Sequence, residues 1–189
     1  MPISKPALDV WDSCCLIGIL NEEKDKLPAL LSQTQKFEDG GALLGIPSVV
    51  VSEVVTLSDG TSAEEKVNKF LDNHYVELLQ ATREVATLSS RMQFRFDSKQ
   101  MPNLKERAIA AGVPKTNCKL TRADSDILAS ALVYRASRLT TYDPFLRFIG
   151  REYITKEAGV VIDIPDSSWL PFPPPNKENT SGRKLKVVI

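Results

Sequence analysis

Residues 7–20 read ALDVWDSCCLIGIL and predict a β-strand, a sharp turn and a helix in direct succession. Apolar and β-forming residues fill positions 7–11, as is typical of a strand. Asp12 and Ser13 come next, and a side-chain oxygen here can cap the free backbone N–H groups of a helix that starts near Cys14. The segment therefore places the carboxylate of Asp12 at the carboxyl end of a strand, where a helix begins.

A second strand and helix meet within residues 42–55, which read ALLGIPSVVVSEVV. β-Branched residues favour a strand throughout, but proline fits poorly inside a strand and serine is a good N-cap. We therefore expect a short strand that ends at Ile46 and a helix that follows Ser48. This arrangement places Glu53 just past the second strand.

The rest of the chain continues to alternate between helix and strand patterns. Helical spacing of apolar residues, or a capping pattern, predicts helices at 27–37, 62–72, 85–96, 102–111 and from 121 onwards. Short β-prone runs predict strands at 75–79, 138–142 and 159–164. Strands that alternate with helices predict an α/β fold with a parallel sheet.

The chain's 189 residues, of which 42% are hydrophobic, suffice for one domain with a buried core. Residues 1–164 carry the alternating pattern. From Pro165 the composition changes, because five of the chain's 12 prolines lie between Pro165 and Pro175 and a basic stretch follows. We expect residues 165–189 to form a tail outside the core, with an extended, polyproline-like backbone.

Charge is balanced overall but unevenly distributed. Lysine and arginine total 24, as do aspartate and glutamate, so the formal net charge is zero. This balance excludes a polybasic protein that works by bulk attraction to nucleic acid. Residues 1–90 contain 7 basic and 14 acidic side chains, whereas residues 91–150 contain 11 and 5. The basic stretch is a local place where a phosphate backbone can bind.

Three features favour a cytoplasmic protein without a membrane segment. The three cysteines have no C-x-x-C spacing, so they support neither a disulfide framework nor a zinc knuckle, and a reducing compartment is expected. The longest apolar runs fall well short of the roughly 20 residues that span a bilayer. The first residues lack the charged and apolar regions of a secretory signal.

Acidic residues recur where strands end or the next helices begin. Asp12 follows the first strand, Glu53 the second and Asp143 the fourth, while Asp124 and Asp126 open the helix before the fourth strand. Sites in parallel α/β sheets form beyond the carboxyl ends of the strands. Carboxylates gathered there repel one another unless they are protonated or bind a metal. Hard divalent cations take oxygen ligands and activate water, so the pattern indicates metal-dependent phosphodiester chemistry.

Four segments resemble the signature segments of PIN-domain nucleases, and they occur in the same order. They are DSCCLI at 12–17, IPSVVVSE at 46–53, ADSDILASAL at 123–132 and LTTYD at 139–143. The resemblance covers about residues 6–164. It implies a three-layer α/β/α fold around a parallel sheet of about five strands, and an endoribonuclease that depends on Mg²⁺ or Mn²⁺.

The resemblance also implies a role for each acid. Asp12, Glu53, Asp124 and Asp143 match the acidic quartet of the family. Asp12 and Asp143 are then expected to be the main metal ligands or their water-bridged partners, Glu53 to orient the attacking water and Asp124 to complete the metal shell. Asp126 lies two residues after Asp124, which turns its side chain by roughly 200° around the helix. It can therefore bind the metal only from the first helical turn or through water, and the choice between Asp124 and Asp126 stays open.

Several neighbouring residues are expected to support the acids or the substrate. Ser13 and Thr141 occupy positions where the family often has a small hydroxyl beside the metal. Cys14 departs from the more usual polar residue that follows Ser13. Three arginines in the basic stretch are expected to contact RNA: Arg91, Arg95 and Arg122. Arg91 and Arg95 fit a solvated helix face equally well.

Small stand-alone PIN proteins are commonly toxins of toxin–antitoxin pairs. The resemblance therefore implies an RNA substrate and an inhibitory antitoxin, and it leaves a homodimer open. The chief alternative is a catalytically silent PIN-like module that binds RNA or protein.

Two enzyme classes with related folds are excluded. A phosphatase of the haloacid dehalogenase type needs aspartates two positions apart, whereas Asp9 and Asp12 are three apart. Asp9 is instead expected to be a solvated or capping residue. A Rossmann cofactor domain needs a G-x-G-x-x-G motif after the first strand, and none is present.

Overall fold

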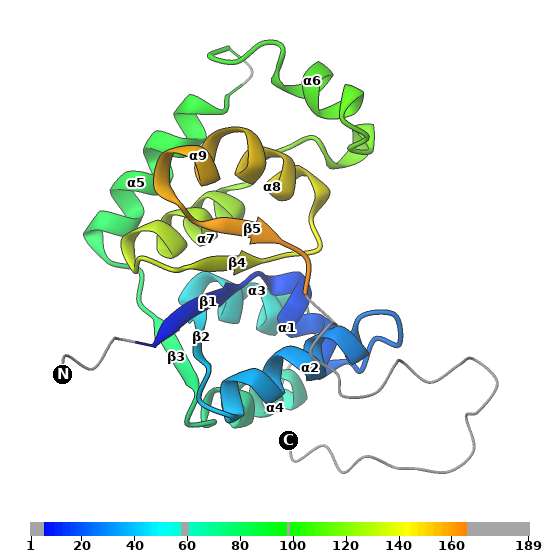
Figure 1. Cartoon of the computed structure of the whole chain (residues 1–189), viewed down its shortest axis with the longest axis vertical. Coiled ribbons are helices and arrows are strands. Elements are labelled where there is room, and N and C mark those ends of the chain that lie inside the picture. The colour runs from blue at the N-terminus through cyan, green and yellow to red at the C-terminus, as the bar shows by residue number, and fades with distance from the viewer. Residues whose placement is uncertain (1–5, 58–60, 98, 166–189) are drawn as a thin grey trace.

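The computed structural model describes residues 6–57, 61–97 and 99–165, and its centre is a sheet of five parallel strands (Figure 1). Their spatial order is β3-β2-β1-β4-β5, and their bounds are β1 Ala7–Trp11, β2 Ala42–Pro47, β3 Val76–Leu79, β4 Arg138–Thr140 and β5 Val161–Asp163. Strands β2 and β3 lie on one side of β1, and the later strands β4 and β5 lie on its other side. The strand order therefore reverses between β1 and β4, which is where parallel sheets commonly bind ligands.

Helices connect the strands and lie on both sides of the sheet (Figure 1). The first half of the chain contributes α1 (Ser13–Leu20), α2 (Leu27–Glu38), α3 (Ser48–Leu57) and α4 (Thr61–Leu71). The crossover from β3 to β4 contains α5 (Arg83–Arg95), α6 (Leu104–Ala110), a 3-10 turn at Lys115–Asn117 and α7 (Arg122–Val133). Between β4 and β5 lie α8 (Pro144–Ile149), a π-helical turn at Gly150–Ile154 and α9 (Thr155–Ala158).

The central strand β1 is the middle of the core. Its residues Val10 and Trp11 are fully buried, and successive strand residues point to opposite faces of the sheet. The Trp11 ring packs against Phe37 of α2 and Phe70 of α4, with centroid distances of 6.1 and 6.2 Å. Because both faces of β1 are buried, the position of its carboxyl end, and of Asp12 after it, is fixed by packing.

The parallel α/β architecture and the expected helices and strands are confirmed, with ends shifted by a few residues. The chain changes from strand to helix at Pro47 and Ser48, close to the predicted boundary. The sequence analysis did not predict the helical segment at 144–158. There, Asp143 ends the loop after β4 and also caps α8, and Pro144 takes a first-turn position where its missing N–H is not needed.

Two expectations concern parts of the chain away from the sheet. The predicted tail lies outside the described residues from position 166 onwards. Within the described ranges, no helix combines the length and the apolar character that crossing a bilayer requires.

Candidate active site

Asp12 lies directly after β1 and is the most highly hydrogen-bonded acid of the site. Its side chain is 6% exposed, and its Oδ1 accepts the backbone N–H of Ser13 at 2.6 Å, which caps α1. Its Oδ2 accepts hydrogen bonds from the Thr141 hydroxyl at 2.6 Å and the Cys14 thiol at 3.1 Å. Donors from β1–α1 and from the loop after β4 therefore hold one carboxylate in place.

Glu53 reaches the same region from α3. The Ser13 hydroxyl donates a hydrogen bond to Glu53 Oε2, although the two residues are 40 positions apart in sequence. Strand β2 ends at Pro47 and helix α3 begins at Ser48, so Glu53 on this helix lies past the carboxyl end of the strand. The Ser13 hydroxyl thus lies within hydrogen-bond distance of both Asp12 and Glu53, and its supporting role beside a metal stays a prediction.

Asp143 is joined to Asp12 through Thr141. The backbone N–H of Asp143 donates to the Thr141 Oγ1 at 2.9 Å, and that hydroxyl in turn donates to Asp12. The Asp143 carboxylate also caps α8, because its Oδ1 accepts the N–H groups of Phe145 and Leu146 at 2.6 and 2.9 Å. One buried threonine therefore positions two of the acids relative to each other.

Asp124 enters the site from the N-terminus of α7. It forms a capping box with Thr121: Asp124 Oδ2 accepts the Thr121 N–H at 2.6 Å, and the Thr121 hydroxyl accepts the Asp124 N–H at 3.1 Å. Burial and, to a smaller extent, the negative charges of Asp12 and Asp143 raise the pKa of Asp124 to about 6, although the hydrogen bonds with Thr121 act in the opposite direction. Burial, together with the charge of Asp12, also raises the pKa of Asp143.

The four acids supply oxygen donors only, which is the donor set that Mg²⁺ and Mn²⁺ prefer. In residues 6–57, 61–97 and 99–165, no group of three or more His, Cys, Asp or Glu side chains is arranged to hold a metal ion by itself. Mg²⁺ commonly keeps several waters and binds one or two carboxylates directly. Binding of such an ion by these acids stays a prediction.

The structure separates the two acids of α7. Asp126 Oδ1 lies 3.4 Å from Nε of Arg122 on the helix surface, and the charges that act on Asp124 are those of Asp12 and Asp143. Asp126 is thus paired with Arg122, whereas Asp124 lies within the electrostatic influence of the other acids; which of the two would bind a metal stays a prediction.

The three arginines expected to contact RNA lie on or near α5. Arg122 also donates a hydrogen bond to the Ser90 hydroxyl at 3.3 Å, so its guanidinium bridges α7 and α5. Arg91 is exposed, and the Arg95 guanidinium lies 5.6 Å from the centre of the Phe96 ring. Their contact with RNA stays a prediction.

Two residues near the acids differ from the sequence-based expectation. The Cys14 sulfur donates to Asp12 and accepts the Tyr142 N–H at 3.2 Å, so it takes part in the hydrogen-bond network. This role was not predicted from the sequence; the place of Cys14 in the first turn after Asp12 is the signal that could have indicated its contact with Asp12. The expectation that Asp9 is solvated or capping was wrong: it is 7% exposed, and its Oδ1 accepts the Thr140 hydroxyl at 2.8 Å.

Comparisons with known proteins identify the fold. No protein-family model and no curated protein matches the sequence. Among solved structures, the chain is similar to VapBC2 from Rickettsia felis bound to a DNA fragment from their promoter, with a TM-score of 0.53 and 14% identity over 84% of this chain and 99% of the other. This likeness shows a shared α/β fold, and the resemblance to PIN domains is confirmed at the level of the fold.

Two further structures are similar at lower TM-scores. They are VapC20 from Mycobacterium tuberculosis, a sarcin-ricin loop cleaving toxin (TM-score 0.47, 11% identity, 75% of this chain and 95% of the other), and FitAcB from Neisseria gonorrhoeae (TM-score 0.46, 14% identity, 83% and 97%).

Proposed function

We propose that this protein is a metal-dependent endoribonuclease that hydrolyses RNA phosphodiester bonds, and that it is the toxin of a toxin–antitoxin pair in the cytoplasm. The observation that carries the proposal is the convergence of three acids from separate parts of the chain: Thr141 joins Asp12 to Asp143 by hydrogen bonds, and the charges of both raise the pKa of Asp124. The fold shared with VapBC2 and the resemblance of the sequence to PIN-domain nucleases support it.

The chain's own residues would hold the ion and the substrate in a fixed arrangement. Asp12 and Asp143 are the proposed direct ligands, and Asp124 would complete the shell. A bound Mg²⁺ or Mn²⁺ supplies an activated water and stabilises the charge that develops on the phosphoryl oxygens. The hydroxyl of Thr141 keeps the two direct ligands in register before the substrate arrives, so little reorganisation is needed during the reaction.

Glu53 is the proposed positioning group for the attacking water. The Ser13 hydroxyl holds one of its oxygens, which leaves the other oxygen of the carboxylate to accept a hydrogen bond from water. Basic side chains between residues 91 and 150 would neutralise the RNA backbone, and this contribution falls as salt concentration rises.

A PIN-like module that binds without cutting is the second candidate. The observation that favours it is that the acids stabilise helices: Asp12, Asp124 and Asp143 each accept backbone N–H groups at the N-terminus of a helix. Such caps are useful without any catalysis.

Cleavage assays separate the two candidates. We expect the purified full-length protein to cut a labelled single-stranded RNA in Mg²⁺ or Mn²⁺ and to stop when EDTA is added. Binding of the RNA without cleavage in either metal would support the silent module instead.

The proposed antitoxin is tested by coexpression. We expect the protein encoded beside this one to copurify with it and to inhibit RNA cleavage at equimolar concentration. A neighbouring protein that neither copurifies nor inhibits would contradict the toxin–antitoxin part of the proposal and leave the nuclease part unaffected.

A further inference from the structure

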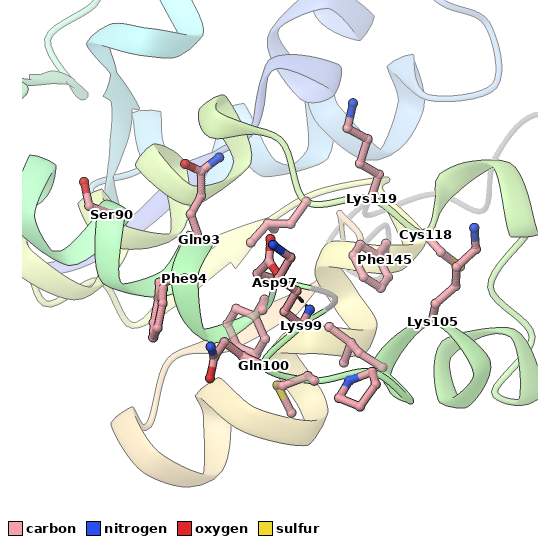
Figure 2. A pocket seen from close by; sticks show the side chains of 15 residues that line it. Ser90, Gln93, Phe94, Asp97, Lys99, Gln100, Lys105, Cys118, Lys119 and Phe145 are labelled. Atoms are coloured by element: carbon pink, nitrogen blue, oxygen red, sulfur yellow. Dashed lines mark hydrogen bonds between the residues drawn. The ribbon is translucent and has the colours of Figure 1, made fainter.

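A pocket of about 770 Å³ lies next to the acids, between the C-terminal end of α5, the chain around α6 and the start of α8 (Figure 2). This volume is typical of a small-ligand site. Two lining residues adjoin the acids directly: Phe145, whose N–H is bound by Asp143, and Leu120, which precedes the capping partner of Asp124. The pocket and the proposed metal site therefore share the chain segments at the starts of α7 and α8.

The pocket combines aromatic rings with positive charge. Phe94 on α5 is 67% exposed, although it is a large apolar side chain. Figure 2 shows Phe94 and Gln93 on the α5 side, with Phe145 across from them. One carboxylate, that of Asp97, lines the pocket, and its Oδ1 is occupied by the backbone N–H of Lys99 at 2.7 Å. The cations outnumber it, and they are Lys99, Lys105 and Lys119.

We propose that this pocket binds one unpaired nucleotide of an RNA strand whose next phosphate lies at the acids. The inference rests on the proposed function and adds the place where the strand is held beside the scissile bond. The base would stack against the exposed ring of Phe94, and the lysine ammonium groups would neutralise the flanking phosphates. Stacking on an aromatic ring tolerates any base, because every base has a π-face.

Charge favours RNA over a protein segment as the occupant. An apolar peptide in this pocket would cover lysine side chains without giving them counter-charges, which costs free energy. A nucleotide provides a flat apolar face and negative charge together. The pocket is lined by Leu120 and Phe145 at the starts of α7 and α8, where Asp124 and Asp143 also lie, so a strand held in the pocket would be able to reach the proposed metal site.

RNA binding in EDTA tests the pocket without requiring cleavage. In fluorescence anisotropy with a labelled single-stranded RNA, we expect Phe94→Ala in the full-length chain to weaken affinity by roughly 5- to 100-fold, because one stacking contact is lost. Phe94→Tyr keeps the stacking surface and should bind as the wild type does. Leu57→Ala is the matched control, since Leu57 is an exposed apolar residue on α3 that does not line the pocket.

Salt dependence tests the lysines. Replacing Lys105 by glutamine is expected to reduce the slope of log affinity against log salt concentration by about 0.7, as expected when one phosphate contact to a single strand is lost. Lys69→Gln on α4 is the control and should leave the slope unchanged, because Lys69 is exposed and does not line the pocket.

The outcomes separate the pocket from the nuclease activity. Equal RNA affinity of wild type and Phe94→Ala, or no RNA binding by the wild type, would overturn the pocket assignment. RNA binding that depends on Phe94 and Lys105, without cleavage in Mg²⁺ or Mn²⁺, would support the pocket and contradict the proposed nuclease.

Discussion

Thr141 is the residue on which the geometry of the acids depends most. It is fully buried, donates to Asp12 and accepts the N–H of Asp143. A methyl group of the same size can replace its hydroxyl without changing the volume, but it can make neither hydrogen bond. The consequences of this change for stability and for activity can therefore be measured separately.

Thr141→Val is expected to lower the free energy of unfolding by about 1–3 kcal/mol, because a buried N–H and a buried carboxylate lose their partner. Cleavage should fall by about 10- to 100-fold, since misplaced ligands weaken the alignment of the reacting groups. Thr141→Ser keeps the hydroxyl and should restore most of both quantities. Denaturant unfolding and RNA cleavage rates check this, and a valine variant with wild-type cleavage would contradict the positioning role.

Asp9 is a buried acid outside the proposed chemistry. Burial raises its pKa to about 6 from an ordinary value of 3.8, against the hydrogen bond from Thr140 and the charge of Arg138. The native state therefore keeps its proton to a higher pH than the unfolded state does. Stability contributed by this group is fully present below pH 4 and falls as the pH rises from about 4 to about 6.

Asp9→Asn removes this titration. The rise in the pKa of Asp9 means that its buried charge lowers the free energy of unfolding above pH 6 by about 3 kcal/mol. The asparagine variant should therefore gain stability relative to wild type as the pH rises from 4 to 7, whereas the exposed control Asp72→Asn should not. Thermal melts across this pH range check the prediction, and parallel curves for wild type and Asp9→Asn would contradict it.

At the scale of elements, the turn after α8 packs tightly against β5. A Cβ added to Gly150 would lie 2.5 Å from the Cβ of Ile162, which is part of the rigid base of that side chain. Ile162 is buried on β5, so it has little room to move. A glycine is required here by close approach, although glycine generally weakens a helix.

Gly150→Ala is therefore expected to destabilise the protein by about 1–3 kcal/mol through overpacking. In an exposed helix the same substitution would stabilise by up to about 1 kcal/mol, so the sign of the change is diagnostic. Chemical denaturation provides the measurement. A stabilised Gly150→Ala variant would show that α8 and β5 are farther apart than described.

Local signals explain which elements could be predicted from the sequence. Pro47 and Ser48 are strong local markers, so the boundary between β2 and α3 was predictable. Asp143 and Pro144 carry an equally good N-cap and first-turn signal, but they also end a strand, and the short helices after them lack a long apolar period. The predicted order of strands and helices places the four acids where strands end or the next helices begin.

Contacts between distant segments explain what could not be predicted. Whether Cys14 meets Tyr142 depends on the pairing of β1 with β4, and the burial of Asp9 depends on this pairing and on the helices that cover β1. Neither arrangement follows from local sequence. The pairing of Asp126 with Arg122, and the exposure of Asp124 to the charges of Asp12 and Asp143, likewise depend on how α7 lies relative to the sheet.

For the whole molecule, the acidic and the basic parts of the chain contribute different residues to the proposed site. The acidic first 90 residues supply Asp12 and Glu53, and the basic residues 91–150 supply Asp124 and Asp143 together with the lysines of the pocket. The order of the strands brings these halves together at β1 and β4. A molecule without net charge can thus carry a local basic surface, the proposed place for a phosphate backbone, near the acids of the proposed metal site.

The most direct test of the central claim is the rate of RNA cleavage in Mn²⁺ by the full-length wild type, Asp12→Asn, Asp143→Asn and the exposed control Asp72→Asn. Circular dichroism melts establish that each variant is folded. The account predicts that the wild type and Asp72→Asn cleave at similar rates and stop in EDTA, while folded Asp12→Asn and Asp143→Asn show no cleavage above background. Undiminished cleavage by either of these two folded variants would contradict the proposed active site.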